Sequence, residues 1–101
     1  MKRLTPMINK FSEDLNTAVI TTKFILEDKS PILYVFHYEE DGMWQFSGNE
    51  NEINDNDYKV ISLQEIINID SSILEIANLA LNHMAFRESK KDSWKIKPIE
   101  D

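Results

Sequence analysis

The sequence predicts an α+β domain in which an N-terminal helix and short central helices pack on a mostly antiparallel sheet. Two observations lead to this prediction. Short segments rich in β-branched and aromatic residues follow one another through turn-forming residues, and helix-start signals stand near the N-terminus and in the second half of the chain. The 101 residues suffice for one core, and neither a linker nor a repeat divides them, so we expect a single domain over residues 1–101.

The first expected element is an amphipathic helix. Pro6 stands at its first helical position, where a missing N–H costs nothing. Residues 18–26 (AVITTKFIL) then change to a β-branched pattern and predict a strand, which the turn residues DKSP at 28–31 end. The apolar residues at helical spacing in the first element are Leu4, Met7, Ile8, Phe11 and Leu15.

Residues 32–48 (ILYVFHYEEDGMWQFSG) predict a β-hairpin whose register depends on its loop. A two-residue turn at Asp41-Gly42 would pair the aromatic residues of the second strand with polar ones. A three-residue loop that also includes Glu40 pairs aromatic with aromatic residues and places Gly42 at a left-handed position. We therefore expect Trp44 opposite Tyr38, with five aromatic side chains on one buried face: Tyr34, Phe36, Tyr38, Trp44 and Phe46.

The second half predicts a strand, two short helices and a closing hairpin. Residues 59–62 favour the strand, and a capping box from Ser62 to Glu65 begins the first helix. Asp70 or Ser72 can cap the second helix, and Asn82 is suited to its left-handed end. The alternating runs 83–88 and 93–99 predict the hairpin, with Pro98 at an edge or at the end of its strand.

The charge of the chain is concentrated in one stretch. The net charge is −7, and residues 39–58 hold seven acidic residues and no basic one. Such a charge repels nucleic acid and anionic lipid, so we expect neither as a partner, while a basic protein would be attracted. The alternative is that these acids only aid solubility. No apolar segment is long enough for a signal or a membrane span, so we expect a cytoplasmic protein.

Known catalytic and metal-binding patterns are lacking in the sequence. There is no cysteine, the serines lie in neither GxSxG nor SxxK, and the two glycines form no phosphate-binding loop. His37 with Glu39 offers at most two metal ligands, and the run NEINDND lacks the glycine of an EF-hand loop. We expect no enzyme, no cofactor and no metal. Arg87 could pair internally with an acid such as Asp70, although spacing does not decide this.

The order of several segments resembles a bacterial family of immunity proteins of polymorphic toxin systems. The likeness spans roughly residues 18–97, and its most specific parts are Asp41-Gly42 with Trp44 and Phe46, the block 62–70, and Ala85 with Arg87. Asn82 and His83 stand where the family would have a glycine. The resemblance implies neutralisation of a toxin, but it supplies no contact residue.

Charge and resemblance together predict a non-catalytic domain that binds a basic toxin domain. A housekeeping interaction module or a homodimer using the edge of the terminal hairpin stays open. So does an enzyme for a cationic small molecule, with a pocket lined by Trp44, Tyr38 and carboxylates. The residues that we expect to contact a protein partner are Glu40, Asp41, Glu50, Glu52, Asp55, Asp57 and Tyr58.

Overall fold

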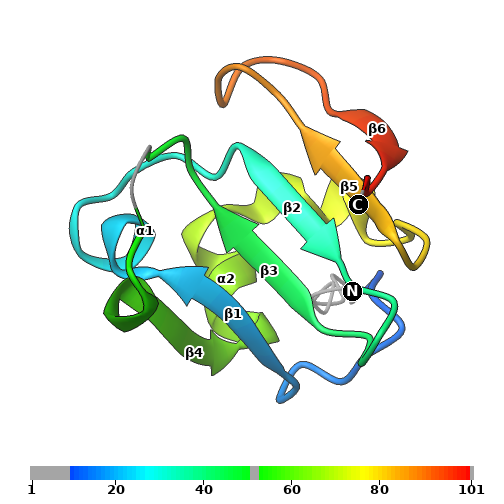
Figure 1. The fold of residues 1–101 in the computed structure, drawn as a ribbon, viewed down its shortest axis with the longest axis horizontal. Helices are drawn as coiled ribbons and strands as arrows, with labels where there is room; N and C mark the ends of the chain where they lie inside the picture. Colours follow the sequence, from blue (N-terminus) through cyan, green and yellow to red (C-terminus); the bar gives the residue numbers. More distant parts are fainter. Residues whose placement is uncertain (1–9, 51–52, 101) are drawn as a thin grey trace, which may run out of the picture.

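The computed structural model describes residues 10–50 and 53–100, and within these the chain forms one six-stranded sheet with the order β4-β1-β3-β2-β5-β6 (Figure 1). Helices α1 (Lys23–Glu27) and α2 (Leu63–Ile69) and the 3₁₀ helices η1 (Asp55–Asp57) and η2 (Ser71–Ile76) lie in the connections. The strands are β1 (Ala18–Thr22), β2 (Tyr34–His37), β3 (Trp44–Ser47), β4 (Tyr58–Ser62), β5 (His83–Phe86) and β6 (Lys95–Pro98).

The sheet is mixed, which corrects the prediction of a mostly antiparallel sheet. β1 and β3 run parallel, with Ile20 opposite Gln45, whereas the other neighbouring strands are antiparallel. The reason lies in the connection after β1. The chain passes through α1 before it enters β2, and the hairpin then returns β3 into the place between β1 and β2. Hairpin connections alone therefore did not determine the order of the strands.

The predicted N-terminal helix is wrong for its described part, and residues 1–9 lie outside the described residues. Residues 10–17 form bends and a turn in which the Thr17 amide donates to the Asp14 carbonyl at 3.0 Å. The carbonyl oxygens of Leu15 and Thr17 accept hydrogen bonds from the first amides of α2, at 3.0 and 2.8 Å. These contacts satisfy amides that a helix start leaves unpaired, and they fasten the turn at residues 14–17 to the start of α2.

The predicted strand over residues 18–26 is also too long. It ends at Thr22, whose hydroxyl oxygen accepts a hydrogen bond from the Ile25 amide at 3.4 Å and so caps α1. A β-branched residue with a side-chain oxygen can serve as the last residue of a strand and as an N-cap at once. The change from strand to helix therefore falls at Thr22, the last residue of the β-branched run, and not at the turn residues 28–31.

The hairpin of β2 and β3 forms, but its predicted register is wrong by one residue. His37 lies opposite Trp44, and Val35 lies opposite Phe46. Trp44 and Phe46 are buried as expected, with 2% and 0% of their surface exposed. The aromatic residues that were expected beside them face the other side of the sheet, and these are Tyr34, Phe36 and Tyr38.

A four-residue loop rather than a three-residue loop connects these strands. The Tyr38 amide donates to the Met43 carbonyl at 2.9 Å, and the Gly42 amide donates to the Tyr38 carbonyl at 3.0 Å. Gly42 has a φ of +72°, the left-handed conformation that the sequence predicted. Both loop lengths place the glycine in this conformation, so the glycine could not select the register.

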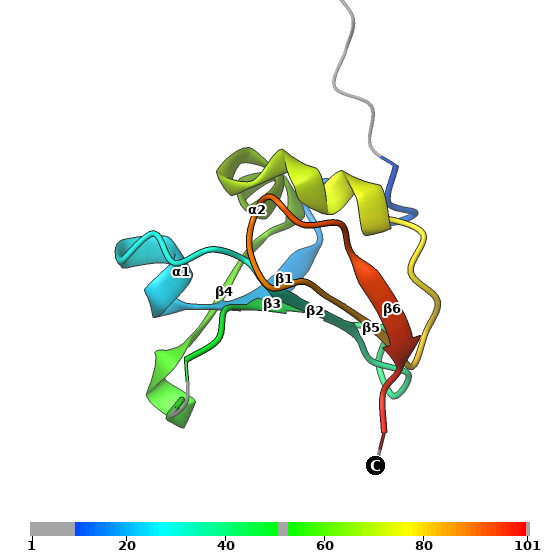
Figure 2. The same cartoon turned by 90° about the horizontal axis from the view of Figure 1, so that it is seen from above.

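Helix α2 and the 3₁₀ helix η2 cover one face of the sheet and leave the other face without a layer (Figure 2). Two predicted caps are confirmed: Ser62 and Glu65 form the capping box of α2, and Asp70 caps η2. Asn82 is left-handed, with a φ of +64°, but it does not end the helix as predicted, because η2 ends at Ile76 and Asn82 lies in the turn before β5. The closing hairpin of β5 and β6 is confirmed, with Pro98 at the end of the edge strand. Among the described residues, no helix has the length and apolar character needed to cross a membrane.

Candidate functional site: the open face of the sheet

The face of the sheet that no helix covers carries a row of side chains across all six strands. The register places Ile20 beside Gln45, Gln45 beside Phe36, and Phe36 beside Met84. Residues that lie directly opposite each other point to the same face. The complete row, from one edge to the other, is Val60, Ile20, Gln45, Phe36, Met84 and Lys97.

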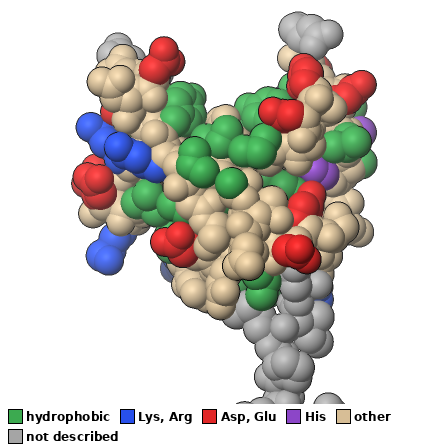
Figure 3. Space-filling model, turned by 90° about the horizontal axis from the view of Figure 1, so that it is seen from below, with side chains coloured by type: hydrophobic (Ala, Val, Ile, Leu, Met, Phe, Trp, Pro, Cys, Tyr) green, Lys and Arg blue, Asp and Glu red, His purple; other side chains and the backbone are tan. Residues whose placement is uncertain are grey.

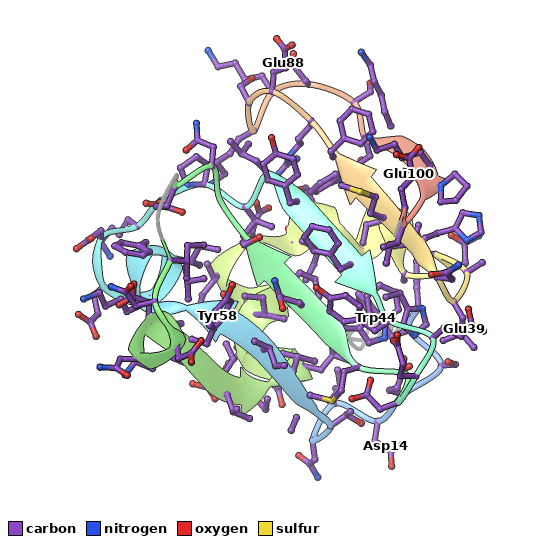
Figure 4. The ribbon with its side chains drawn as sticks, in the orientation of Figure 1. Asp14, Glu39, Trp44, Tyr58, Glu88 and Glu100 are labelled. Carbon is purple, nitrogen blue, oxygen red and sulfur yellow. The ribbon has the colours of Figure 1, made fainter. Side chains whose placement is uncertain are left out.

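Further aromatic residues flank this row. Tyr38 lies two residues from Phe36 on the same strand face, and their rings stack with centroids 5.8 Å apart. Tyr34 lies opposite Phe86 in the next row, and Tyr58 begins β4 at the far side. Figure 4 shows Tyr58 in front of β1, on the open side of the sheet. We call the apolar residues of this face the open-face patch, and they are Ile20, Tyr34, Phe36, Tyr38, Tyr58, Val60, Met84 and Phe86.

The open-face patch is accessible although its members partly shield one another. Val60 is 67% exposed and Tyr58 is 37% exposed, and the remaining members are partly buried. The Tyr38 hydroxyl donates to Gln45 Oε1 at 3.3 Å, and the Lys97 ammonium lies 5.4 Å from the centre of the Phe86 ring. Seen from below, the patch lines a hollow between two lobes of the molecule (Figure 3). An exposed apolar surface of this kind is typical of a site that binds another molecule.

Acidic loops lie on both sides of the hollow. The β2–β3 loop presents Glu39, Glu40 and Asp41, all exposed, and the β3–β4 connection carries the exposed Asp55. Acidic side chains accordingly appear on both lobes in Figure 3. Burial raises the pKa of the Tyr38 hydroxyl, and repulsion from Tyr58, Glu40 and Asp41 raises that pKa further. Tyr38, at one end of the open-face patch, therefore lies close to negative charge from the β2–β3 loop.

The remaining predicted contact residues differ in their surroundings. Glu50 is partly buried, and its Oε1 atom has no hydrogen-bond partner among the described residues. Asp57 is buried at the end of η1, where its carboxylate accepts from the Asn54 amide at 2.9 Å and pairs with Lys23 Nζ at 3.3 Å. The bond from Asn54 lowers the pKa of Asp57, and Lys23 contributes in the same direction. Glu52 lies outside the described residues.

The acidic stretch was visible in the sequence, whereas most of the open-face patch was not. The predicted register turned Phe36 and Tyr38 inward, and it left no reason to examine Met84 or Phe86 as surface residues. One signal was available: in the strand YKVIS, Val60 alternates with the inward Ile61, so both faces of that strand carry apolar residues. Of the open-face patch, Tyr58 is the residue that the sequence predicted to contact a protein partner, and it lies on this face.

His37, the candidate metal ligand, is part of the core. Its ring stacks on Trp44 with centroids 3.9 Å apart, and its Nδ1–H donates to the Leu79 carbonyl at 2.8 Å. Its Nε2 atom lies 3.8 Å from Glu13 Oε2, which also accepts the Trp44 indole N–H at 2.9 Å, and Glu39 is exposed on the loop. Across residues 10–50 and 53–100, no three His, Asp or Glu side chains are grouped closely enough to hold a metal ion.

Arg87 holds the closing hairpin on the core. Its guanidinium donates to Asp70 Oδ2 at 2.9 Å, to the Ser72 hydroxyl at 3.0 Å and to the Ile32 carbonyl at 3.1 Å. The Trp94 ring covers it at 4.0 Å. Burial acts to raise the pKa of Asp70, but the hydrogen bonds from Ser72 and the charge of Arg87 outweigh burial and hold that pKa below its ordinary value. The internal pairing with Asp70 that the sequence left open is therefore present.

An exposed apolar sheet face between acidic loops is typical of a domain that binds another protein. The chain matches the family model described as the immunity protein Imm33 domain over residues 19–97. Because this match covers most of the 101 residues, the chain belongs to the Imm33 family of immunity proteins. The resemblance seen in the sequence is confirmed, and the family indicates a toxin-neutralising role. Searches of curated proteins and of solved structures found no match.

Proposed function

We propose that this chain neutralises a cognate bacterial toxin by binding it stoichiometrically in the cytoplasm, without catalysis of its own. The observation that carries this proposal is the family match over residues 19–97. The finer part of the proposal is that the partner is a basic toxin domain, drawn to the acidic loops. The charge of −7 and its concentration in residues 39–58 support such a partner over nucleic acid or membrane.

The acidic residues have a defined part in this proposal. Opposite potentials raise the rate of association and help to select the partner, while their contribution to affinity is smaller. Glu40, Asp41 and Asp55 are exposed and available for this role. Glu50, Glu52 and Tyr58 remain proposed contacts, whereas Asp57 would add little, because its carboxylate is already paired with Lys23.

The test is protection of bacterial cells that express a candidate toxin domain, and the genes adjacent to this one are the first source of candidates. Expression of this chain should restore growth, and the purified proteins should form a one-to-one complex. A protein that neither protects nor binds would refute the proposed function.

Charge variants then test the basic character of the partner. The double variant Glu40→Gln with Asp55→Asn should lower the association rate about three- to tenfold at low salt, and high salt should remove the difference. The matched control is Glu65→Gln with Glu75→Gln. It also removes two negative charges, but from α2 and η2 on the covered side of the sheet. Glutamine at position 65 retains the capping box. Equal rates for both double variants would contradict steering by the acidic loops.

A further inference from the structure

We infer that the open-face patch is the energetic centre of the toxin interface, and that its occupant is a convex apolar surface of the basic toxin domain. This inference rests on the proposed function and names the surface through which it works. The acidic loops would form the rim of the interface and the patch its dry centre. Interfaces commonly have this arrangement, with an apolar, aromatic-rich core inside a polar rim.

The composition of the patch supports this assignment. Aromatic residues and methionine are enriched at the centres of protein interfaces, and the patch has both at adjacent positions, because Phe36 lies opposite Met84 and stacks on Tyr38. The rings of Phe36 and Tyr38 are already held by the strand and by the hydrogen bond from Tyr38 to Gln45. Binding therefore costs little side-chain conformational entropy at these two residues.

Charge decides which protein occupies the patch. A second copy of the chain would bring two sets of acidic loops together, each belonging to a chain of net charge −7. Repulsion between them disfavours a symmetric dimer across the hollow. A basic partner instead places its cations against Glu40, Asp41 and Asp55 while its apolar surface enters the hollow between them. The observations therefore favour a heterologous basic partner.

The test separates the apolar centre from the charged rim by kinetics. In the variant Phe36→Thr with Met84→Thr, threonine keeps the preference for a strand while both apolar side chains are truncated. We expect binding to the toxin domain identified by the protection test to weaken at least 30-fold, mainly through faster dissociation, with the same salt dependence as the unchanged chain. The matched control is Ile69→Thr, an apolar residue 42% exposed on α2. It should bind within about twofold of the unchanged chain, because it lies on the covered side.

Three outcomes would overturn the inference. If the unchanged chain binds and protects but the double variant binds equally well, the patch is not the centre, while the proposed function stands. If the unchanged chain does not bind, both the inference and the proposed function fail. If sedimentation shows a dimer of the unchanged chain that the double variant abolishes, the occupant is a second copy. Thermal unfolding of each variant checks the fold, and a cross-linker placed at Val60 locates the partner without truncating the patch.

Discussion

Loss of the Arg87 guanidinium should destabilise the protein more than any other single polar change described above. The variant Arg87→Met keeps much of the side-chain volume but removes the charge and every donor. Asp70 is then left as a carboxylate only 8% exposed without its cation, and the Ile32 carbonyl loses its bond. Removing one partner of a buried ion pair costs about 3–5 kcal/mol. The total free energy of unfolding of a domain of this size is about 5–15 kcal/mol.

Urea unfolding followed by tryptophan fluorescence measures this cost. Trp44 is buried and Trp94 covers Arg87, so both indoles change environment when the chain unfolds. With an m-value of about 1.5 kcal/mol/M, a loss of about 4 kcal/mol lowers the midpoint by about 2–3 M. The urea midpoint of Arg87→Lys should fall between those of the unchanged protein and Arg87→Met, because lysine keeps the charge but not the forked donors. A midpoint for Arg87→Met within about 0.5 M of the unchanged protein would refute the assigned role.

The ion pair of Arg87 with Asp70 also predicts how the stability of the protein changes at low pH. The pKa of Asp70 is lowered in the folded protein, so its contribution is present above the pKa of an unfolded aspartate, about 3.9, and is lost as the pH falls through the folded value. The stability gap between the unchanged protein and Arg87→Met should therefore narrow in strong acid. A gap that stays constant from pH 7 to the lowest pH at which both fold would contradict this linkage.

Three smaller changes test individual local features, each measured by urea midpoint. Gly42→Ala should cost about 1 kcal/mol, because φ is +72° and an added Cβ meets nothing within 4 Å, so backbone strain is the whole effect; a neutral result would contradict it. Ser62→Ala should cost about 1 kcal/mol through loss of the α2 cap, whereas Glu65→Gln should cost little; equal costs would argue against the capping box. Trp44→Phe should destabilise by about 2 kcal/mol or more, since it removes the indole bond to Glu13 and leaves space in the core; an unchanged midpoint would refute the role of that bond.

Features that depend on neighbouring residues in the chain were predictable from the sequence. The caps at Ser62 and Asp70, the left-handed Asn82 and the closing hairpin each follow from a few adjacent residues, and each is present. The parallel contact of β1 with β3 joins residues 20 and 45, and no turn chemistry encodes it. Such contacts are settled by the packing of the whole sheet.

The register of the hairpin was not predictable because both faces of β2 carry apolar residues. The prediction buried the face with the larger rings, whereas the structure buries Val35 and His37. The face with the smaller side chains, Val35 and His37, lies beneath the helices. His37 gains the stack on Trp44 and the hydrogen bond to the Leu79 carbonyl. These gains depend on residues far along the chain. The same error concealed the candidate site, since the rings turned outward are the centre of the open-face patch.

The position of β1 has a consequence for synthesis on the ribosome. β1 is the first strand to leave the ribosome, but its two neighbours in the sheet are β3 and β4, so it has no partner until β3 is complete at residue 47 and lacks its second partner until residue 62. The β2–β3 hairpin also needs no residue beyond 47, and because its contacts are closer in sequence it can form before β1 joins it. A chain that terminates before residue 47 therefore leaves the strand β1 unpaired, and one that terminates before residue 62 leaves one edge of β1 open to aggregation.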